Sequence, residues 1–153
     1  MTVPTSTPDL TQRPPRSPRV RLGGYVLLPR ILDKGRAAHA GKLGEYHYGG
    51  KGMDWHFFNF VGLDHEALKA ELAKGVGDGE VLAWVNANAK HPRQPWEIAA
   101  WSNYHEQRTP DSDAETITDF AEAVGKFSTT REDIRTWFDL LDLDDHCTFG
   151  GKA

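Results

Sequence analysis

Apolar residues recur at helical spacing in short blocks that glycines and prolines separate, and this pattern most constrains the fold of the chain. Three blocks have clear boundaries. Asp64 is a good N-cap and Gly75 a good stop for the first block, and Pro95 stands at the first helical position of the third. We therefore predict helices over residues 65–74, 78–89 and 95–107.

Two further helix starts follow. Ser112 and Glu115 have the spacing of a capping box, and a stripe at i, i+3, i+4, i+7 and i+10 comes after them. The stripe consists of Ile117, Phe120, Ala121, Val124 and Phe127. A second box, either Thr130 with Asp133 or Thr129 with Glu132, precedes the stripe of Ile134, Trp137, Phe138 and Leu141. The sequence thus predicts two more helices, starting after residues 112 and 130.

The segment 22–36 places charges among apolar residues. Its apolar residues at helical spacing are Leu22, Tyr25, Val26, Pro29 and Leu32, and Pro29 either kinks this helix or begins it. On the helical wheel Asp33 and Arg36 fall on the apolar side, whereas Arg30 and Lys34 point towards water. A buried Asp–Arg pair at i, i+3 is either a structural ion pair or the charged floor of a pocket.

Six glycines then interrupt the helical pattern between residues 35 and 52. We expect residues 40–53 to form a loop or short hairpin with Glu45–Tyr48 as its strand-like patch. The aromatic-rich residues 55–63 are predicted to form a core strand or an irregular segment beneath that loop. The chain as a whole is predicted to be mostly α, a single compact domain of five to six helices with a short non-helical Gly/aromatic insert.

Proline and arginine dominate residues 1–19, which we expect to be an extended arm with a disordered tip. In this arm Arg13, Arg16 and Arg19 are placed to tether it along the body. Residues 20–147 form the predicted helical domain, and residues 148–153 a flexible tail.

Charge is unevenly distributed along the chain. Residues 1–42 hold eight Lys/Arg and two Asp/Glu, a balance of +6, while residues 43–153 hold ten and twenty, a balance of −10. The favoured interpretation is that the basic segment packs on the acidic body of the same chain or of a second copy. Nucleic acid is an unlikely partner, because only Tyr25 in the basic segment offers a stacking ring.

The single cysteine, Cys147, makes no internal disulfide, so a reducing cytoplasm is the expected location. The longest charge-free apolar run is far too short to cross a membrane. No two of the seven histidines have metal-site spacing on a helix, and we expect neither a metal nor a cofactor. The Gly49–Gly52 sequence GGKG lacks the preceding strand and the following Ser/Thr of a phosphate loop.

Arginine, histidine and tyrosine side chains gather in two segments and suit anion binding or acid–base chemistry. The candidates are Arg30, Asp33, Arg36, His39, Tyr46 and His47, joined by Tyr104, His105 and Arg108 from a later helix. We predict a pocket between residues 30–48 and the helix 95–108 for a small carboxylate or phosphate ligand, either enzymatic or purely binding. The alternative is a non-enzymatic interaction or homo-oligomerisation module that uses the basic arm.

Five segments in order also resemble one protein family. They read LGGYVLLPRILDKGRA, GEYHY, FFNFVGLD, VLAWVNAN and PWEIAAWSNYHEQRTP. From about Asp9 to Leu143 the chain resembles the DUF5069 family of bacterial domains of unknown function. The resemblance implies a small, mostly helical, single-domain bacterial protein, and it implies neither an activity nor catalytic residues. The GGKG loop differs from the loop typical of the family, which implies a ligand specificity of its own if that loop lines a site.

Overall fold

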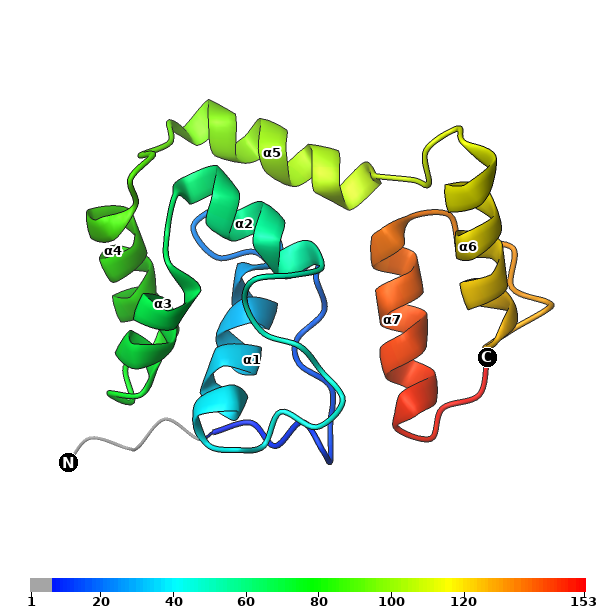
Figure 1. The fold of residues 1–153 in the computed structure, drawn as a ribbon, viewed down its shortest axis with the longest axis horizontal. Coiled ribbons are helices and arrows are strands. Elements are labelled where there is room, and N and C mark those ends of the chain that lie inside the picture. Colours follow the sequence, from blue (N-terminus) through cyan, green and yellow to red (C-terminus); the bar gives the residue numbers. More distant parts are fainter. Residues whose placement is uncertain (1–6) are drawn as a thin grey trace.

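The computed structural model describes residues 7–153, which form seven helices and no strand (Figure 1). The helices are α1 (Leu28–His39), α2 (Met53–Val61), α3 (His65–Leu72), α4 (Asp78–Asn88), α5 (Pro95–Gln107), α6 (Ala114–Gly125) and α7 (Trp137–Thr148). The all-α class is confirmed. The predicted number of five to six helices was too low, because the aromatic segment is itself a helix.

Helix α1 is the centre of the fold. It lies between α3 and α4 on one side and α7 on the other (Figure 1), and Leu28, Ile31 and Leu32 are fully buried. Pro29 lies in its first turn, so the proline begins the helix rather than kinking it. Leu22 and Tyr25 precede the helix and form an isolated bridge between their backbones.

The aromatic segment forms α2, not the predicted strand or irregular segment. Phe57, Phe58 and Val61 share one face of this helix and are buried in the main core, while Trp55 is half-exposed on the other. The Glu45–Tyr48 patch likewise has no strand partner in the described part of the chain; its Tyr46 amide donates to Leu43 O in a turn. Aromatic residues favour strands only weakly, and packing decided otherwise here.

Helices α3, α4 and α5 have the predicted starts, and their ends agree to within two residues. The Asp64 carboxylate accepts a hydrogen bond from the Glu66 amide as the predicted N-cap of α3. Helix α5 is anchored on the segment before α1 by buried Ser102, whose hydroxyl donates to Gly24 O at 2.7 Å and accepts from the Val26 amide at 3.2 Å.

The last two helix starts were predicted at the wrong residues. Asp113, not Ser112, caps α6. Helix α7 begins after a capping box of Thr136 and Asp139, so both predicted boxes near residue 130 are wrong. The Ser128 hydroxyl instead accepts hydrogen bonds from two following amides, and Asp133 pairs with the Arg131 side chain. Local side-chain bonds of this kind hold a turn in place of a helix.

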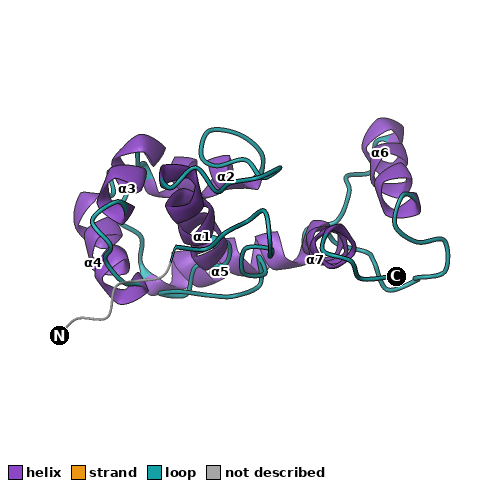
Figure 2. Ribbon diagram, turned by 90° about the horizontal axis from the view of Figure 1, so that it is seen from below, coloured by secondary structure: helices purple, strands orange, loops and turns teal. Residues whose placement is uncertain are grey.

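Helix α6 stands apart from the body of the molecule (Figure 2). Of its apolar stripe only Phe120 is buried, against the Trp137 ring at a centroid distance of 5.0 Å. Ile117 is 49% exposed. The apolar stripe from which α6 was predicted is therefore buried at a single residue.

The described part of the N-terminal arm lies against the body. Leu10 is buried, and its amide donates to Lys42 O at 2.9 Å. The predicted disordered tip lies largely in residues 1–6, outside the described range. At the other end Thr148 belongs to α7, and the flexibility of the tail stays a prediction. No helix in the described range combines the length and apolar character needed to span a membrane.

Candidate functional site

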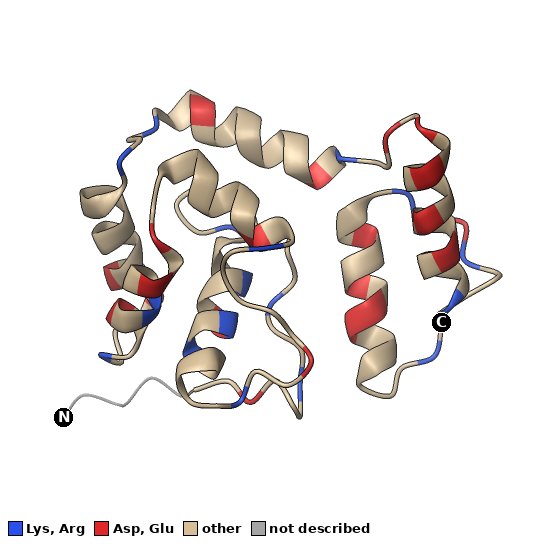
Figure 3. Cartoon of the chain, viewed as in Figure 1, with Lys and Arg blue, Asp and Glu red and all other residues tan. Residues whose placement is uncertain are grey.

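Every lysine and arginine between residues 16 and 36 contacts a carboxylate of the same chain. The pairs are Arg16 with Asp33 and Asp78, Arg19 with Asp139 and Asp142, Arg21 with Glu106, Arg30 with Asp145, Lys34 with Asp54, and Arg36 with Asp78. The basic segment thus packs on the acidic body within one chain, as the charge pattern favoured. Figure 3 shows basic residues on α1 and acidic residues on α7, the two helices that the Arg30–Asp145 pair joins.

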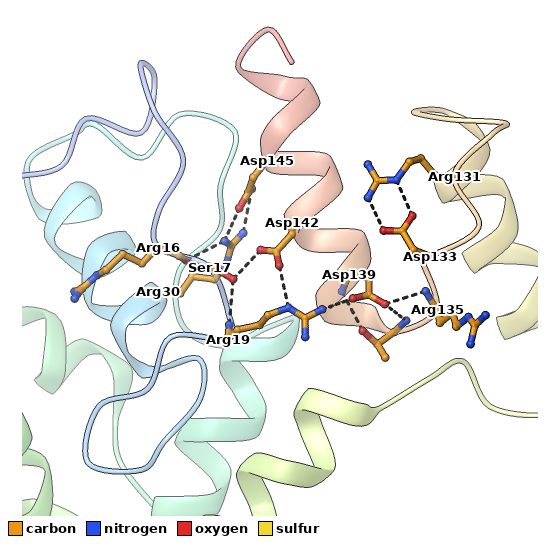
Figure 4. Close-up of polar contacts among 11 residues, drawn as sticks. Arg16, Ser17, Arg19, Arg30, Arg131, Asp133, Arg135, Asp139, Asp142 and Asp145 are labelled. Atoms are coloured by element: carbon orange, nitrogen blue, oxygen red, sulfur yellow. Dashed lines mark hydrogen bonds and ion pairs between the residues drawn. The ribbon is translucent and has the colours of Figure 1, made fainter. Parts of the chain in front are cut away.

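Helix α7 docks through an acidic face (Figure 4). Asp139, Asp142 and Asp145 follow one another at i, i+3 and i+6, so they share a side of the helix. Asp139 and Asp142 bind Arg19, and Asp142 also accepts a hydrogen bond from Ser17 at 2.8 Å. These contacts fix α7 against the arm.

Arg30 of α1 makes the buried contact with α7. Arg30 is 4% exposed and donates to both Asp145 oxygens at 2.7 and 3.3 Å. Tyr46 donates its hydroxyl hydrogen to Asp145 Oδ1 at 2.7 Å, and its ring lies 5.6 Å from the Arg30 guanidinium carbon. Burial and this carboxylate raise the pKa of Tyr46, so the phenol stays protonated and acts as a donor.

One turn further along α1, Lys34 is also buried. It is 8% exposed, and its Nζ lies 2.7 Å from Asp54 Oδ1, while the Gly49 amide donates to Asp54 Oδ2 at 3.0 Å. Burial lowers the pKa of Lys34, and Asp54 offsets part of that effect. The prediction that Arg30 and Lys34 point to water was wrong: the wheel included residues 22–26, which precede the helix, and α2 and α7 cover that face of α1.

Arg30, Tyr46 and His47, three predicted site residues, line one cleft of about 240 Å³. We call it the α1–α7 cleft, because it is enclosed by α1, the loop before α2, the start of α2 and the middle of α7. Its lining comprises Leu27, Arg30, Lys34, Glu45, Tyr46, His47, Lys51, Gly52, Met53, Asp54, Leu141 and Asp144. Lys34, Lys51 and Asp54 were not among the predicted site residues.

Two backbone features mark this cleft. Leu27 has φ 70°, the one positive φ at a non-glycine residue in the described range. Such strain at a bulky side chain is concentrated at functional sites. Gly52 is the N-cap of α2 and offers no side chain to the free amides of the first turn, so the positive end of the helix dipole faces the cleft. The GGKG loop does lead directly into a helix, although it lacks the strand and Ser/Thr of a phosphate loop.

Asp33, Arg36 and His39 lie outside the α1–α7 cleft. Asp33 and Arg36 line a separate cleft of about 310 Å³ with Arg13 and Arg16. Both predicted residues are largely covered, but their mutual contact is long, 3.9 Å between Arg36 Nη1 and Asp33 Oδ1.

Stronger contacts tie this pair to other elements. Arg16 donates its backbone amide and two side-chain groups to Asp33, at 2.9 to 3.1 Å. Arg36 donates to Asp78 at 2.9 Å and to Val76 O at 3.1 Å. The arrangement joins the arm, α1 and the start of α4, which favours the structural interpretation of the pair. His39 is exposed and borders a smaller hollow beside Arg36.

The three candidates from α5 do not line the α1–α7 cleft, whose far wall is α7 instead. His105 is buried against the rings of Trp101 and His56, at centroid distances of 4.5 and 5.0 Å. Burial, with His56 and Arg108 nearby, lowers the pKa of His105 to about 4. Tyr104 is 62% exposed, and the Arg108 guanidinium carbon lies 5.9 Å from the Trp137 ring centroid.

No cluster of three or more His, Cys, Asp or Glu side chains suited to a metal ion occurs within residues 7–153. A family model described as "Domain of unknown function (DUF5069)" matches residues 12–147. The matched range contains all the lining residues of the α1–α7 cleft. No curated protein matches the chain.

Proposed function

This chain belongs to the DUF5069 family of domains of unknown function, and we propose that its α1–α7 cleft binds a small carboxylate or phosphate anion. One observation carries the proposal. Two buried cations, Arg30 and Lys34, line a single small cleft from one face of the central helix, and Tyr46, His47 and Lys51 belong to the same lining.

The lining of the cleft holds three carboxylates, Glu45, Asp54 and Asp144, together with the three cations Arg30, Lys34 and Lys51. Asp54 is occupied by Lys34 and the Gly49 amide, and Asp145 by Arg30 and Tyr46. Lys51 and His47 are the exposed lysine and histidine of this lining. The start of α2 adds backbone amides, which favour phosphate and carboxylate oxygens.

Volume limits the ligand to a small one. The cleft measures about 240 Å³, which is below the roughly 300–1,000 Å³ of pockets that hold drug-sized ligands. A metabolite of a few carbon atoms with one or two anionic groups fits this space better than a nucleotide.

The internal pairing of the basic segment also bears on the alternative function. Arg16, Arg19 and Arg21 bind carboxylates of their own chain, so those charges already have partners. The arm as an interaction module stays a prediction.

Calorimetric titration with inorganic phosphate and with acetate, at constant ionic strength, tests the proposal. Lys51→Gln is expected to weaken binding about tenfold, because a charged hydrogen bond contributes roughly 1.5–3 kcal/mol. Lys42→Gln is the matched control: Lys42 is an exposed lysine of the same loop that does not line the cleft. Equal loss in both variants, or no saturable heat with the unmodified protein, contradicts the proposal.

A further inference from the structure

We infer that Lys34 captures the carbonyl group of a small 2-oxo acid in the α1–α7 cleft as a Schiff base, with Asp54 accepting the lysine proton. This inference rests on the anion binding proposed above and specifies the class of anion. It gives a chemical role to the one lysine that is both buried and part of the cleft lining.

The pairing of Lys34 with Asp54 provides the proton acceptor. Nζ and Oδ1 are 2.7 Å apart, within direct reach for proton transfer. Asp54 is held by the Gly49 amide and lies in the first turn of α2, so its position does not depend on Lys34 alone. Burial of the amine disfavours its charged form, which is the usual way that a lysine becomes a nucleophile at neutral pH.

The spacing of the cations fits a 2-oxo acid in particular. Arg30 and Lys34 are four residues apart on one face of α1, about 6 Å along the helix axis. A 2-oxo acid carries its carbonyl carbon one bond from its carboxylate. In the proposed complex the carboxylate contacts Arg30 and the rim residue Lys51, and the adjacent carbonyl carbon meets the amine of Lys34, the third cation of the lining.

The step balances without any oxidant or reductant. The Lys34 ammonium gives one proton to Asp54, and the free amine attacks the carbonyl carbon to form the C–N bond. The former carbonyl oxygen takes the proton back from Asp54. It then leaves as water with a second proton from nitrogen, and the product is a protonated imine. One water molecule is released, and the positive charge stays on nitrogen.

Side-chain accessibility alone and Schiff-base capture in the cleft predict opposite orders of lysine modification. The inference is therefore testable without any variant. The Lys34 side chain is 10% exposed, whereas that of Lys74, on a different part of the surface, is 67% exposed. An unspecific aldehyde reaction modifies Lys74 first. Capture in the cleft modifies Lys34 first.

The experiment treats the full chain at neutral pH with glyoxylate and sodium cyanoborohydride, which reduces an imine to a stable amine, and maps the modified lysines by mass spectrometry. At low glyoxylate the modified fraction of Lys34 is expected to exceed that of Lys74 at least fivefold. Inorganic phosphate is expected to protect Lys34 and to leave Lys74 unchanged. Lys51→Gln is expected to lower modification of Lys34 alone.

Modification of Lys74 with Lys34 untouched overturns the inference, and so does modification of Lys34 that phosphate does not suppress. The phosphate titration of the same protein separates the two proposals. Saturable phosphate binding that depends on Lys51, without capture at Lys34, retains the anion site and removes the Schiff base. The absence of both removes both.

Discussion

Two buried ion pairs, Arg30–Asp145 and Lys34–Asp54, define the side-chain chemistry of this protein. A buried pair gains little net stability over apolar side chains, but a single member left behind is a buried, unpaired charge. Three of the four partners, Arg30, Lys34 and Asp54, line the α1–α7 cleft.

Removing Lys34 alone is therefore expected to be costly. Lys34→Met leaves Asp54 buried without its cation and should lower the free energy of unfolding by about 3–5 kcal/mol. Adding Asp54→Asn should restore part of that loss. Urea unfolding measures both, with Lys74→Met as the control, because its exposed pair with Glu71 contributes at most about 1 kcal/mol. Equal losses in the Lys34 and Lys74 variants would disprove the buried-pair interpretation.

His105 makes stability depend on pH. Its pKa is lowered from 6.5 to about 4, so the unfolded chain binds the proton more tightly than the folded one. Stability from this group is thus present above pH 6.5 and is lost as the pH falls towards 4, by no more than about 3 kcal/mol. His56, whose pKa is also lowered, acts in the same direction.

The matching experiment compares urea unfolding at pH 7 and pH 4.5 in the unmodified protein and in His105→Gln. The unmodified protein is expected to lose more stability between these two pH values than the variant. An identical pH slope in both proteins would contradict the assignment to His105.

Among the elements, α7 is held by charge as much as by apolar contact. Phe138 and Leu143 are buried, but three aspartates make its contacts with α1 and the arm. Asp145→Asn is expected to raise amide hydrogen exchange across residues 137–148 while α3 and α4 stay protected. Asp144→Asn, one residue earlier, is the control, since Asp144 bonds to Thr148 within α7. Uniform loss of protection throughout the molecule would show that α7 does not open separately.

Helix boundaries were predictable where one residue carries the signal. Asp64 and Pro95 fixed the starts of α3 and α5, because a cap or a first-turn proline acts locally. The start of α7 was missed because Thr129, Thr130 and Thr136 all precede an acid at capping distance. Which of them caps depends on where Asp133 and Asp139 find partners, and those partners are set by the tertiary structure.

Four segments of the chain meet at the α1–α7 cleft: α1, the loop before α2, the start of α2 and α7. Lining residues were predicted from the sequence in only two of them, α1 and the loop. Arg30, Tyr46 and His47 were predicted from residue type. Lys34 was not predicted, because the helical wheel included residues 22–26, which precede the helix. A helix that begins at Pro29 places Lys34 on the same face as Arg30, one turn later. The far wall of the cleft is α7 and not the predicted α5. Long-range packing decides which helix lies there, and residue spacing along the chain does not encode it.

Charge neutralisation also acts over the whole molecule. The arm, α1 and α7 carry opposite charges that pair within the chain, so the net charge of −4 conceals a strong internal match. The acidic residues of α6, the helix that stands apart from the body, are exposed and contribute to the net negative charge of the protein. Arg30 and Lys34 at the α1–α7 cleft belong to the same internal pairing, and what distinguishes them is their burial.

An amide-resolved NMR titration of the ¹⁵N-labelled chain with inorganic phosphate decides between the two clefts on either side of α1. We predict saturable shifts confined to residues 45–54 and 141–145, which border the α1–α7 cleft. Saturable shifts centred instead on residues 13–16 and 33–36, where Arg13, Arg16 and Arg36 line the other cleft, or no saturable shift at all, would contradict the anion site proposed for this protein.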